Sequence, residues 1–394
     1  MRLLIIGNGI AGLTAADNFR KNDPESEILL VGEEKSLTYY RTRLSHILAK
    51  DAFDENELLV KDADWYAQRR IRVLTDTRIA RIDYGRREAI VSDGTTIGYD
   101  KLLLATGAHP FLPPITGRGQ KGFFTLHGLD DLHAMREYLQ GREHVVIIGG
   151  GLLGLEAAHS LVSMGKQVRV LEFFPYLLPR QLDTELSHVV EAQLREEGIA
   201  FSLGRSCQAI LGDGAITGIR LDNGEEIPAD AVLCSTGVRP DLTLCQGGPL
   251  AVNKGIVVDD HMRTSLPDVY AAGDVAEHNG VVFGLWTAAL DHGKIAGTNL
   301  AGGDVRYASP LLVATLNLGQ VRLFSAGSVA EPDSVVTYRE GKAFHRLYVK
   351  AGRVAGAVLT GDMGLMGKAR NLVQQQAGVP AGDGGNEHFM QLMK

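Results

Sequence analysis

Cysteine is scarce in this chain of 394 residues. The three cysteines are Cys207, Cys234 and Cys245, and no C-x-x-C pair occurs. Their number and uneven spacing exclude a disulfide framework and a four-cysteine metal site. The chain also lacks a histidine cluster, a Ser-His-Asp order and a carboxylate-rich metal motif. We therefore expect no metal centre and no mechanism that uses a vicinal thiol pair.

Long apolar runs and an excess of positive charge are missing as well. Runs such as 145–148 have the length of a strand, far below the ~20 residues that cross a bilayer, so we expect no membrane span. The net charge of -7 disfavours nucleic acid and anionic membranes as partners. The N-terminal residues do not resemble a secretory signal, and we expect a cytoplasmic protein.

Glycine, in contrast, is abundant, with 47 residues. Apolar residues make up 45% and charged residues 22% of the chain, which is typical of a folded globular protein. The length predicts two to four domains. The glycine content indicates many turns in which the backbone approaches another group closely.

Two segments of the chain repeat one order of strand, glycine turn and helix. The apolar run 3–6 leads into a G-x-G-x-x-G turn at 7–12, and the run 145–148 leads into a second turn at 149–154. An acidic residue follows the next strand in each segment, where a dinucleotide-binding unit places a carboxylate against a ribose. One such motif is weak evidence, but two copies predict two dinucleotide sites. The positions concerned are Gly7, Gly9, Gly12 and Glu33 or Glu34 in the first copy, and Gly149, Gly151, Gly154 and Glu172 in the second.

The duplication continues beyond the glycine turns. Residues 99–107 and 229–237 each contain an acid, an apolar strand and a Thr-Gly pair, and each follows a hairpin signal at 93–94 or 223–224. From about residue 310 the pattern changes to alternating strands with a helix at 366–376. We predict an α/β protein with two Rossmann-like domains and a small C-terminal α+β domain. The expected boundaries are 1–108 with 240–308 for the first domain, 109–239 for the second and 309–394 for the third.

Three further segments carry a family resemblance that covers residues 1 to about 308. Residues 38–45 (TYYRTRLS), 270–275 (YAAGDV) and 284–289 (GLWTAA) resemble the pyridine nucleotide-dependent flavoprotein oxidoreductases with two dinucleotide sites, a fold like that of glutathione reductase. Within that family they are most similar to the branch of NADH:rubredoxin reductases and the flavoprotein parts of assimilatory reductases. The resemblance implies FAD at the first glycine turn and NADH at the second.

The resemblance also implies roles for individual residues. Arg41 is expected near the flavin and diphosphate, and the Asp274 carboxylate is expected to accept hydrogen bonds from the ribityl chain. The predicted cofactor-binding residues are Gly7, Gly9, Ile10, Ala11, Gly12, Glu33, Glu34, Arg41, Ile79, Ala105, Thr106, Gly107, Gly149, Gly151, Leu152, Leu153, Gly154, Glu172, Gly237, Gly273, Asp274 and Leu285.

Two residues are predicted to act in catalysis. Glu156 resembles the family's glutamate near the nicotinamide and the flavin, with a solvated helix charge as the alternative. Trp286 precedes a helix expected at 287–300, whose positive end would stabilise the anionic reduced flavin; the alternative for Trp286 is a core aromatic. Glu172 hydrogen-bonds a 2'-hydroxyl but repels a 2'-phosphate, and no arginine follows it directly, so we predict NADH rather than NADPH.

The route of the electrons follows from a missing cysteine. Disulfide reductases of this superfamily keep redox cysteines soon after the first ribose acid, whereas residues 33–60 contain none here. The flavin is therefore expected to pass electrons directly to a small acidic one-electron carrier such as rubredoxin, attracted by the net charge of +3 on residues 309–394, which hold nine Lys or Arg and six Asp or Glu. His46 stands where relatives often carry lysine, so the identity of the electron acceptor stays open.

The alternative functions are an NADH oxidase or diaphorase, the flavoprotein component of an assimilatory nitrite or nitrate reductase, and a flavin-binding assembly protein with slow turnover. The oligomeric state stays open.

Overall fold

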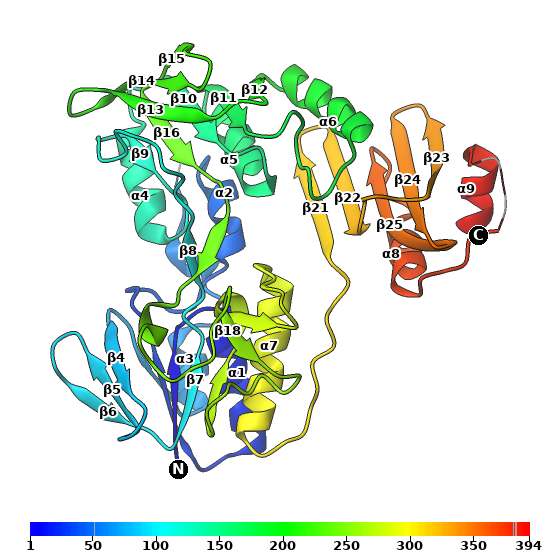
Figure 1. The fold of residues 1–394 in the computed structure, drawn as a ribbon. Helices are drawn as coiled ribbons and strands as arrows, with labels where there is room; N and C mark the ends of the chain where they lie inside the picture. Colours follow the sequence, from blue (N-terminus) through cyan, green and yellow to red (C-terminus); the bar gives the residue numbers. More distant parts are fainter. Residues whose placement is uncertain (51, 381, 383) are drawn as a thin grey trace. The chain divides into compact units, whose positions relative to one another are not determined.

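The computed structural model describes residues 1–50, 52–380, 382 and 384–394. The chain forms two compact units, coloured along the sequence in Figure 1. The first unit combines Met1–Arg43, Ala52–Pro110 and Val238–Pro310, and the second combines Leu44–Asp51, Phe111–Gly237 and Leu311–Lys394. Within the described residues, no helix is long and apolar enough to cross a membrane.

A five-stranded parallel sheet forms the centre of the first unit, in the order β19-β7-β1-β2-β3. Its strands are short apolar runs, and all except the edge strand β3 are buried on both faces, as expected of a parallel sheet covered by other elements. The strands are β1 (Arg2–Ile6), β2 (Glu27–Val31), β3 (Ile71–Leu74), β7 (Lys101–Leu104) and β19 (Val269–Ala271).

Smaller sheets complete the first unit. An antiparallel sheet consists of β4 (Ile79–Asp83), β5 (Glu88–Val91) and β6 (Thr96–Gly98), and the hairpin expected at 93–94 joins the last two. Over its described residues, the first unit also contains two two-stranded sheets and three α-helices. These elements are β8 (Ala108–Pro110) with β17 (Val238–Pro240), β18 (Ile256–Val258) with β20 (Ala276–His278), and the helices α1 (Ile10–Asn22), α3 (Ala63–Gln68) and α7 (Trp286–Leu300).

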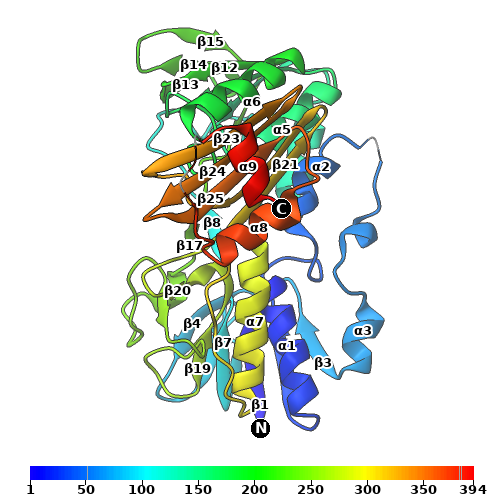
Figure 2. The ribbon, with the colours of Figure 1, turned by 90° about the vertical axis from the view of Figure 1, so that its right-hand side faces the viewer.

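Helices α1 and α7 run side by side, as Figure 2 shows, and they approach closely because α7 carries glycines at the contact. A Cβ atom on Gly293 would lie 2.4 Å from the Ala11 carbonyl oxygen, and one on Gly297 would lie 2.3 Å from the Ala15 carbonyl oxygen. Atoms cannot approach so closely, so glycine is required at both positions. The packing fixes α1, and with it the glycine turn from which α1 begins.

The second unit contains another five-stranded parallel sheet, in the order β12-β11-β10-β16-β9. An antiparallel sheet of three strands accompanies it, and the hairpin expected at 223–224 joins its last two strands. The elements are β9 (Phe123–Phe124), β10 (His144–Ile148), β11 (Gln167–Glu172), β12 (Ile199–Leu203), β16 (Ala231–Cys234), β13 (Cys207–Gly212), β14 (Ile216–Leu221), β15 (Glu226–Pro228), α2 (Leu44–Ile47), α4 (Leu129–Tyr138), α5 (Leu152–Ser163) and α6 (Thr184–Glu196).

The C-terminal residues of the second unit form an antiparallel sheet in the order β21-β22-β25-β24-β23, with two helices packed on it. Its elements are β21 (Val313–Leu318), β22 (Val321–Gly327), β23 (Ser334–Glu340), β24 (Ala343–Lys350), β25 (Arg353–Thr360), α8 (Met366–Gln374) and α9 (Asn386–Leu392). Arg346 and Tyr348 of β24 both hydrogen-bond the Asp183 carboxylate, at 2.6 Å each. Asp183 also caps the N-terminus of α6 through the Leu186 amide, so this carboxylate holds the C-terminal sheet against α6.

The predicted fold class is confirmed: two parallel Rossmann-like sheets and a C-terminal α+β part are present. The helix expected at 287–300 begins one residue earlier, at Trp286, because Leu285 has the extended backbone of a helix cap. The helix expected at 366–376 ends at Gln374. The three domain boundaries stay a prediction, since residues 311–394 cluster with the second parallel sheet.

The contact between α1 and α7 gives a stability prediction. We expect Gly297→Ala to destabilise the first unit by about 1–3 kcal/mol, because the added methyl group overlaps the Ala15 carbonyl oxygen. Thermal unfolding monitored by circular dichroism measures the change. Gly367→Ala is the matched control, because a Cβ at this helical position of α8 meets no atom within 4 Å. An unfolding temperature for Gly297→Ala equal to or above that of the parent would contradict the packing argument.

Candidate functional site

The first glycine turn joins β1 to α1 and is shaped by close backbone contacts. The Gly7 amide donates to the Val31 carbonyl oxygen at 2.8 Å, and Gly7 has a φ of +116°. A Cβ on Gly7 would lie 2.0 Å from the Ala105 carbonyl oxygen, and one on Gly12 would lie 2.1 Å from the Gly7 carbonyl oxygen. Gly9 differs, because nothing lies within 4 Å of its Cβ position. The outer glycines serve packing, whereas the middle glycine borders open space.

The second turn, between β10 and α5, repeats this geometry. The Gly149 amide donates to the Leu171 carbonyl oxygen at 2.8 Å with a φ of +117°, and Gly154 packs on Gly149 as Gly12 packs on Gly7. Gly151 again borders open space. Neither α1 nor α5 has a side-chain hydrogen bond at its N-cap, so the first backbone amides of both helices remain available to an anion. Both turns therefore fit the diphosphate of a dinucleotide.

Glu172 ends β11 beside the second turn and is held rigidly. Its carboxylate accepts hydrogen bonds from the backbone amides of Gly150 at 2.7 Å and Phe174 at 2.9 Å, and the residue is 8% exposed. Phe173 and Phe174 follow it with 70% and 47% exposure. The two residues that follow Glu172 directly are thus aromatic and not cationic, which suits a ribose hydroxyl better than a phosphate. The nearest cationic residue by backbone contact is Arg205, whose amide donates to the Glu172 carbonyl oxygen at 3.0 Å.

The two acidic candidates of the first unit have different surroundings. Glu34 accepts from the Tyr39 hydroxyl at 2.6 Å and pairs with Arg41, so both its carboxylate oxygens are engaged. Glu33 is largely exposed and lies 3.4 Å from the Arg78 guanidinium. Because Glu34 is occupied by side chains of its own segment, we propose Glu33 as the ribose ligand.

Asp274 lies in the short 3-10 turn Gly273–Val275, next to the start of α1. Burial raises the pKa of its carboxyl group, and the nearby Arg41 opposes this rise. No side chain or amide among the described residues hydrogen-bonds the Asp274 carboxylate. A desolvated acceptor without a donor fits a ligand with hydroxyl groups, as the ribityl chain of FAD has.

Trp286 is the first residue of α7, and its ring stacks on Tyr40 with 5.6 Å between centroids. Leu285 caps this helix without a side-chain hydrogen bond, so the positive end of α7 remains available beside Trp286. The sequence did not single out Tyr40, which lies 246 residues away along the chain. Trp286 is half-buried, so the structure keeps both interpretations of this residue open.

The remaining predicted residues lie around the two turns in equivalent places. Thr106 donates to the Asp241 carbonyl oxygen at 3.1 Å, and Thr236, its counterpart beside Gly237, donates to the Phe111 carbonyl oxygen at 2.7 Å. Ile10, Ala11 and Ala105 are buried beside the first turn, and the Ile79 side chain is buried in the core, which leaves only its backbone for a ligand. At the second turn Leu152 is half-buried and Leu153 is 56% exposed. The cofactor-binding roles of all these residues stay predictions.

Glu156 lies in α5, five residues beyond Gly151. Its Oε2 atom accepts a hydrogen bond of 2.7 Å from the Ser45 hydroxyl of α2. Sequence reasoning missed Ser45, which is 111 positions away, although it belongs to the segment 38–45 that carried the family resemblance. His46, by contrast, is exposed.

His292 of α7 is buried, with only 1% of its surface exposed. Its ring stands edge-on to Tyr307 with 4.5 Å between centroids and also contacts Phe283. Burial lowers the pKa of His292 from 6.5 to about 4, and the nearby His278 adds to this effect. Neither ring nitrogen of His292 has a hydrogen-bond partner among the described residues, which suits a neutral ring held by aromatic packing.

The three cysteines are buried, and none forms a disulfide. Burial raises the pKa of Cys207 and Cys245 to about 11 and also raises the pKa of Cys234. The thiols therefore stay protonated at neutral pH, and a packing role accounts for them. Over the described residues, no group of three or more metal-ligating side chains forms.

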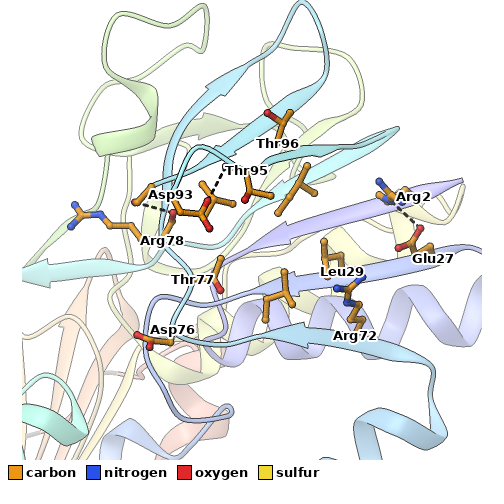
Figure 3. Close-up of a pocket in the computed structure, with 14 residues that line it drawn as sticks. Arg2, Glu27, Leu29, Arg72, Asp76, Thr77, Arg78, Asp93, Thr95 and Thr96 are labelled. Carbon is orange, nitrogen blue, oxygen red and sulfur yellow. Dashed lines mark hydrogen bonds and ion pairs between the residues drawn. The ribbon is translucent and has the colours of Figure 1, made fainter.

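A cavity of about 520 Å³ lies in the first unit, away from the glycine turn. Figure 3 shows its polar lining, with the ion pair of Arg2 and Glu27 at one end and Thr77 and Arg78 at the other. Arg78 also pairs with Glu33, so one end of this cavity borders the proposed ribose ligand. Its charges nearly balance, and it has no arrangement that selects one class of ligand.

Comparison with known proteins gives matches over almost the whole chain. The family model of the pyridine nucleotide-disulphide oxidoreductases matches residues 1–293, and that of the rubredoxin NAD+ reductase C-terminal domain matches residues 313–377. A nitrite reductase [NAD(P)H] of Bacillus subtilis is 31% identical over 96% of this chain and 48% of its own length. An NADH oxidase of Methanocaldococcus jannaschii is 33% identical over 84% of this chain and 77% of its own.

Among solved structures, NADH:rubredoxin oxidoreductase from Clostridium acetobutylicum is similar along its full length. It has a TM-score of 0.85 and 27% identity, and the match covers 99% of each chain. The chain spans about half the length of the first curated relatives it matches.

The buried imidazole predicts a pH effect on stability. The neutral form is favoured in the folded state, whereas the unfolded chain binds a proton below pH 6.5, so this contribution is complete above pH 6.5 and is lost as the pH falls toward 4. The loss amounts to about 3 kcal/mol. His292→Phe retains an aromatic ring but cannot titrate. We expect the stability advantage of the parent over this variant to shrink between pH 7 and pH 4.5, as measured by thermal unfolding; a constant difference would show that His292 does not cause the effect.

Proposed function

The chain belongs to the pyridine nucleotide-disulphide oxidoreductase family, and from this premise we propose that it is an FAD-dependent enzyme that oxidises NADH and passes the electrons to a small carrier protein. The observation that carries the proposal is the pair of equivalent glycine turns, each with an open middle glycine and an uncapped helix. Two dinucleotide sites in one chain suit the transfer of electrons from one bound dinucleotide to the other. When bound, FAD accepts two electrons from NADH as a hydride and releases them one at a time.

The residues of this chain divide the two cofactors between the turns. In the first unit, Asp274 has no hydrogen-bond donor among the residues that the structure describes, and Arg41 lies near it, as a ribityl chain and diphosphate require. In the second unit, the acceptor Glu172 has no cation on the residues that follow it directly, which favours NADH over NADPH. We therefore assign FAD to the first turn and NADH to the second.

The acceptor follows from what surrounds the flavin site. Since no cysteine occurs between residues 33 and 60, electrons leave without a thiol relay. The match to a rubredoxin NAD+ reductase C-terminal domain, and the full-length similarity to an NADH:rubredoxin oxidoreductase, support rubredoxin or a similar iron-sulfur protein. In the C-terminal part, Arg339 and Arg346 are neutralised by Glu185 and Asp183, whereas Lys368 of α8 is exposed and unpaired among the described residues. Helix α8 is thus the proposed contact for an acidic carrier.

A second candidate function is reduction of oxygen. The NADH oxidase relative supports it, because it is 33% identical over 84% of this chain. The nitrite reductase relative supports a third, in which the chain is the flavoprotein component of a larger reductase. All three share reduction of FAD by NADH and differ only in the acceptor.

We expect the purified FAD-loaded chain to lose its yellow colour within seconds when mixed with NADH in a stopped-flow instrument. Reoxidation by purified rubredoxin should then outrun reoxidation by oxygen by at least tenfold, as measured in steady state with anaerobic and aerated samples. The reverse ranking would favour the oxidase. Bleaching that takes minutes would indicate a flavin-binding protein with slow turnover, and a chain that cannot retain flavin would refute the proposal.

Glu172 gives a prediction on cofactor selectivity. We expect Glu172→Gln to lower the ratio of kcat/KM for NADH to that for NADPH by about tenfold, because it removes the charge that repels a 2'-phosphate while retaining an acceptor for the Gly150 amide. Glu172→Ala should lower the ratio further. Glu143→Ala serves as the control. Glu143 is exposed and lies just before β10, at the end of the parallel sheet opposite to Glu172, so this variant removes one negative charge far from the proposed ribose site. An unchanged ratio in both Glu172 variants would remove this assignment.

A further inference from the structure

The Ser45 hydroxyl and the Glu156 carboxylate form a pair that the proposed function leaves unexplained. Ser45 is 4% exposed, and its Oγ donates to Oε2 of Glu156 at 2.7 Å. Both residues belong to the second unit, although they are 111 positions apart. The other carboxylate oxygen, Oε1, accepts no hydrogen bond from any residue that the structure describes. Glu156 thus has one oxygen anchored and one available.

The anchor is itself held by the packing of α2. Leu44, Ile47 and Leu48 are each at most 5% exposed, and the Arg136 guanidinium of α4 donates to the Ile47 carbonyl oxygen at 3.1 Å. Ser45 therefore does not depend on Glu156 for its position. His46, between two buried residues of this helix, is exposed and cannot replace the hydroxyl from its present orientation. The packing of α2 therefore fixes Ser45, and Ser45 in turn fixes the Glu156 carboxylate.

The position of Glu156 on α5 indicates which ligand group the Oε1 atom could bind. Glu156 lies five residues beyond Gly151, about one and a half helical turns from this middle glycine that borders the open space of the second glycine turn. A dinucleotide whose diphosphate lies at that turn extends one half toward its nicotinamide, and the carboxamide NH2 is the hydrogen-bond donor of that ring. A carboxylate accepts from such an amide. Oε1 is the atom of this pair that remains available for it.

We propose that Ser45 is a positioning residue that fixes the Glu156 carboxylate so that Oε1 accepts from the carboxamide of the bound nicotinamide; this rests on the proposed assignment of NADH to the second turn. Without the hydroxyl, the Glu156 side chain is distributed over several rotamers, and the fraction that holds the nicotinamide in the reactive orientation falls. The diphosphate and the ribose keep their own contacts. The loss therefore falls on the rate of reduction rather than on binding.

The test is single-turnover reduction of the flavin by NADH with the FAD-loaded chain. We expect Ser45→Ala to lower the limiting rate about tenfold, equivalent to about 1.4 kcal/mol, while the NADH concentration at half-maximal rate changes less than threefold. Ser45→Cys, which keeps the size but donates weakly, should give an intermediate rate and also covers the case in which the alanine variant does not fold. In a Glu156→Ala background, Ser45→Ala should cause no further loss, because the hydroxyl acts through the carboxylate.

The matched control is Ser187→Ala, which deletes another fully buried hydroxyl of the second unit and should leave the rate unchanged. Equal flavin content and equal unfolding temperature identify properly folded variants. A parent-like rate in both Ser45 variants, or an equal loss from Ser45→Ala with and without Glu156, would overturn the positioning role. If the parent itself is not reduced by NADH, the proposed function fails, and that outcome is visible before any variant is compared.

Discussion

The structure depends on backbone amides that no side chain satisfies. At α1 and at α5 the glycine turn brings the helix N-terminus to the end of the central strand, and neither N-cap residue has a side chain that can accept a hydrogen bond. Because both N-cap residues are glycines, each missing side-chain cap costs only about a few tenths of a kcal/mol compared with a Ser or Asp cap. The cost is offset when an anionic ligand accepts from the same amides, so the unfolding temperature should depend on bound dinucleotide. The glycines that force this geometry, Gly7 and Gly149, are packed against carbonyl oxygens and admit no other residue.

The two units use this shared turn in different ways. Register places Gly32 of the first unit where the second has Glu172, because Val31 and Leu171 occupy the same position beside the turn. Glu172 is fixed by two backbone amides, whereas Glu33 is exposed and pairs with Arg78. The first unit compensates with Asp274, Arg41 and the N-terminus of α7, which enclose more of a ligand. The second has exposed Leu153 and Phe173 at its rim. These differences support the proposed assignment, in which the first turn holds a resident cofactor and the second a ligand that exchanges.

The features that the sequence predicted are those that local chemistry determines. A glycine turn between an apolar strand and a helix depends only on residues that are neighbours in the sequence, and so does an Asn-Gly hairpin. Both could therefore be predicted from the sequence alone. The contacts of Ser45 with Glu156 and of Tyr40 with Trp286 join residues 111 and 246 positions apart, and no local pattern encodes them. The burial of His292 has the same origin: its neighbours along α7 do not reveal that Tyr307 and Phe283 cover it.

The C-terminal sheet shows how a charged contact can serve structure rather than a partner. From the sequence, its excess of basic residues suggested a surface for an acidic carrier, but Arg346 is drawn into the Asp183 carboxylate together with Tyr348. Burial works to raise the pKa of Asp183, yet the hydrogen bonds from the Leu186 amide, Tyr348 and Arg346 prevail and lower it, so the pair stays ionised well below neutral pH. Because the same carboxylate caps α6, the sheet and that helix share one anchor. The proposed carrier contact on α8 therefore belongs to a sheet that Asp183 anchors to α6, and through α6 to the proposed NADH-binding part of the same unit.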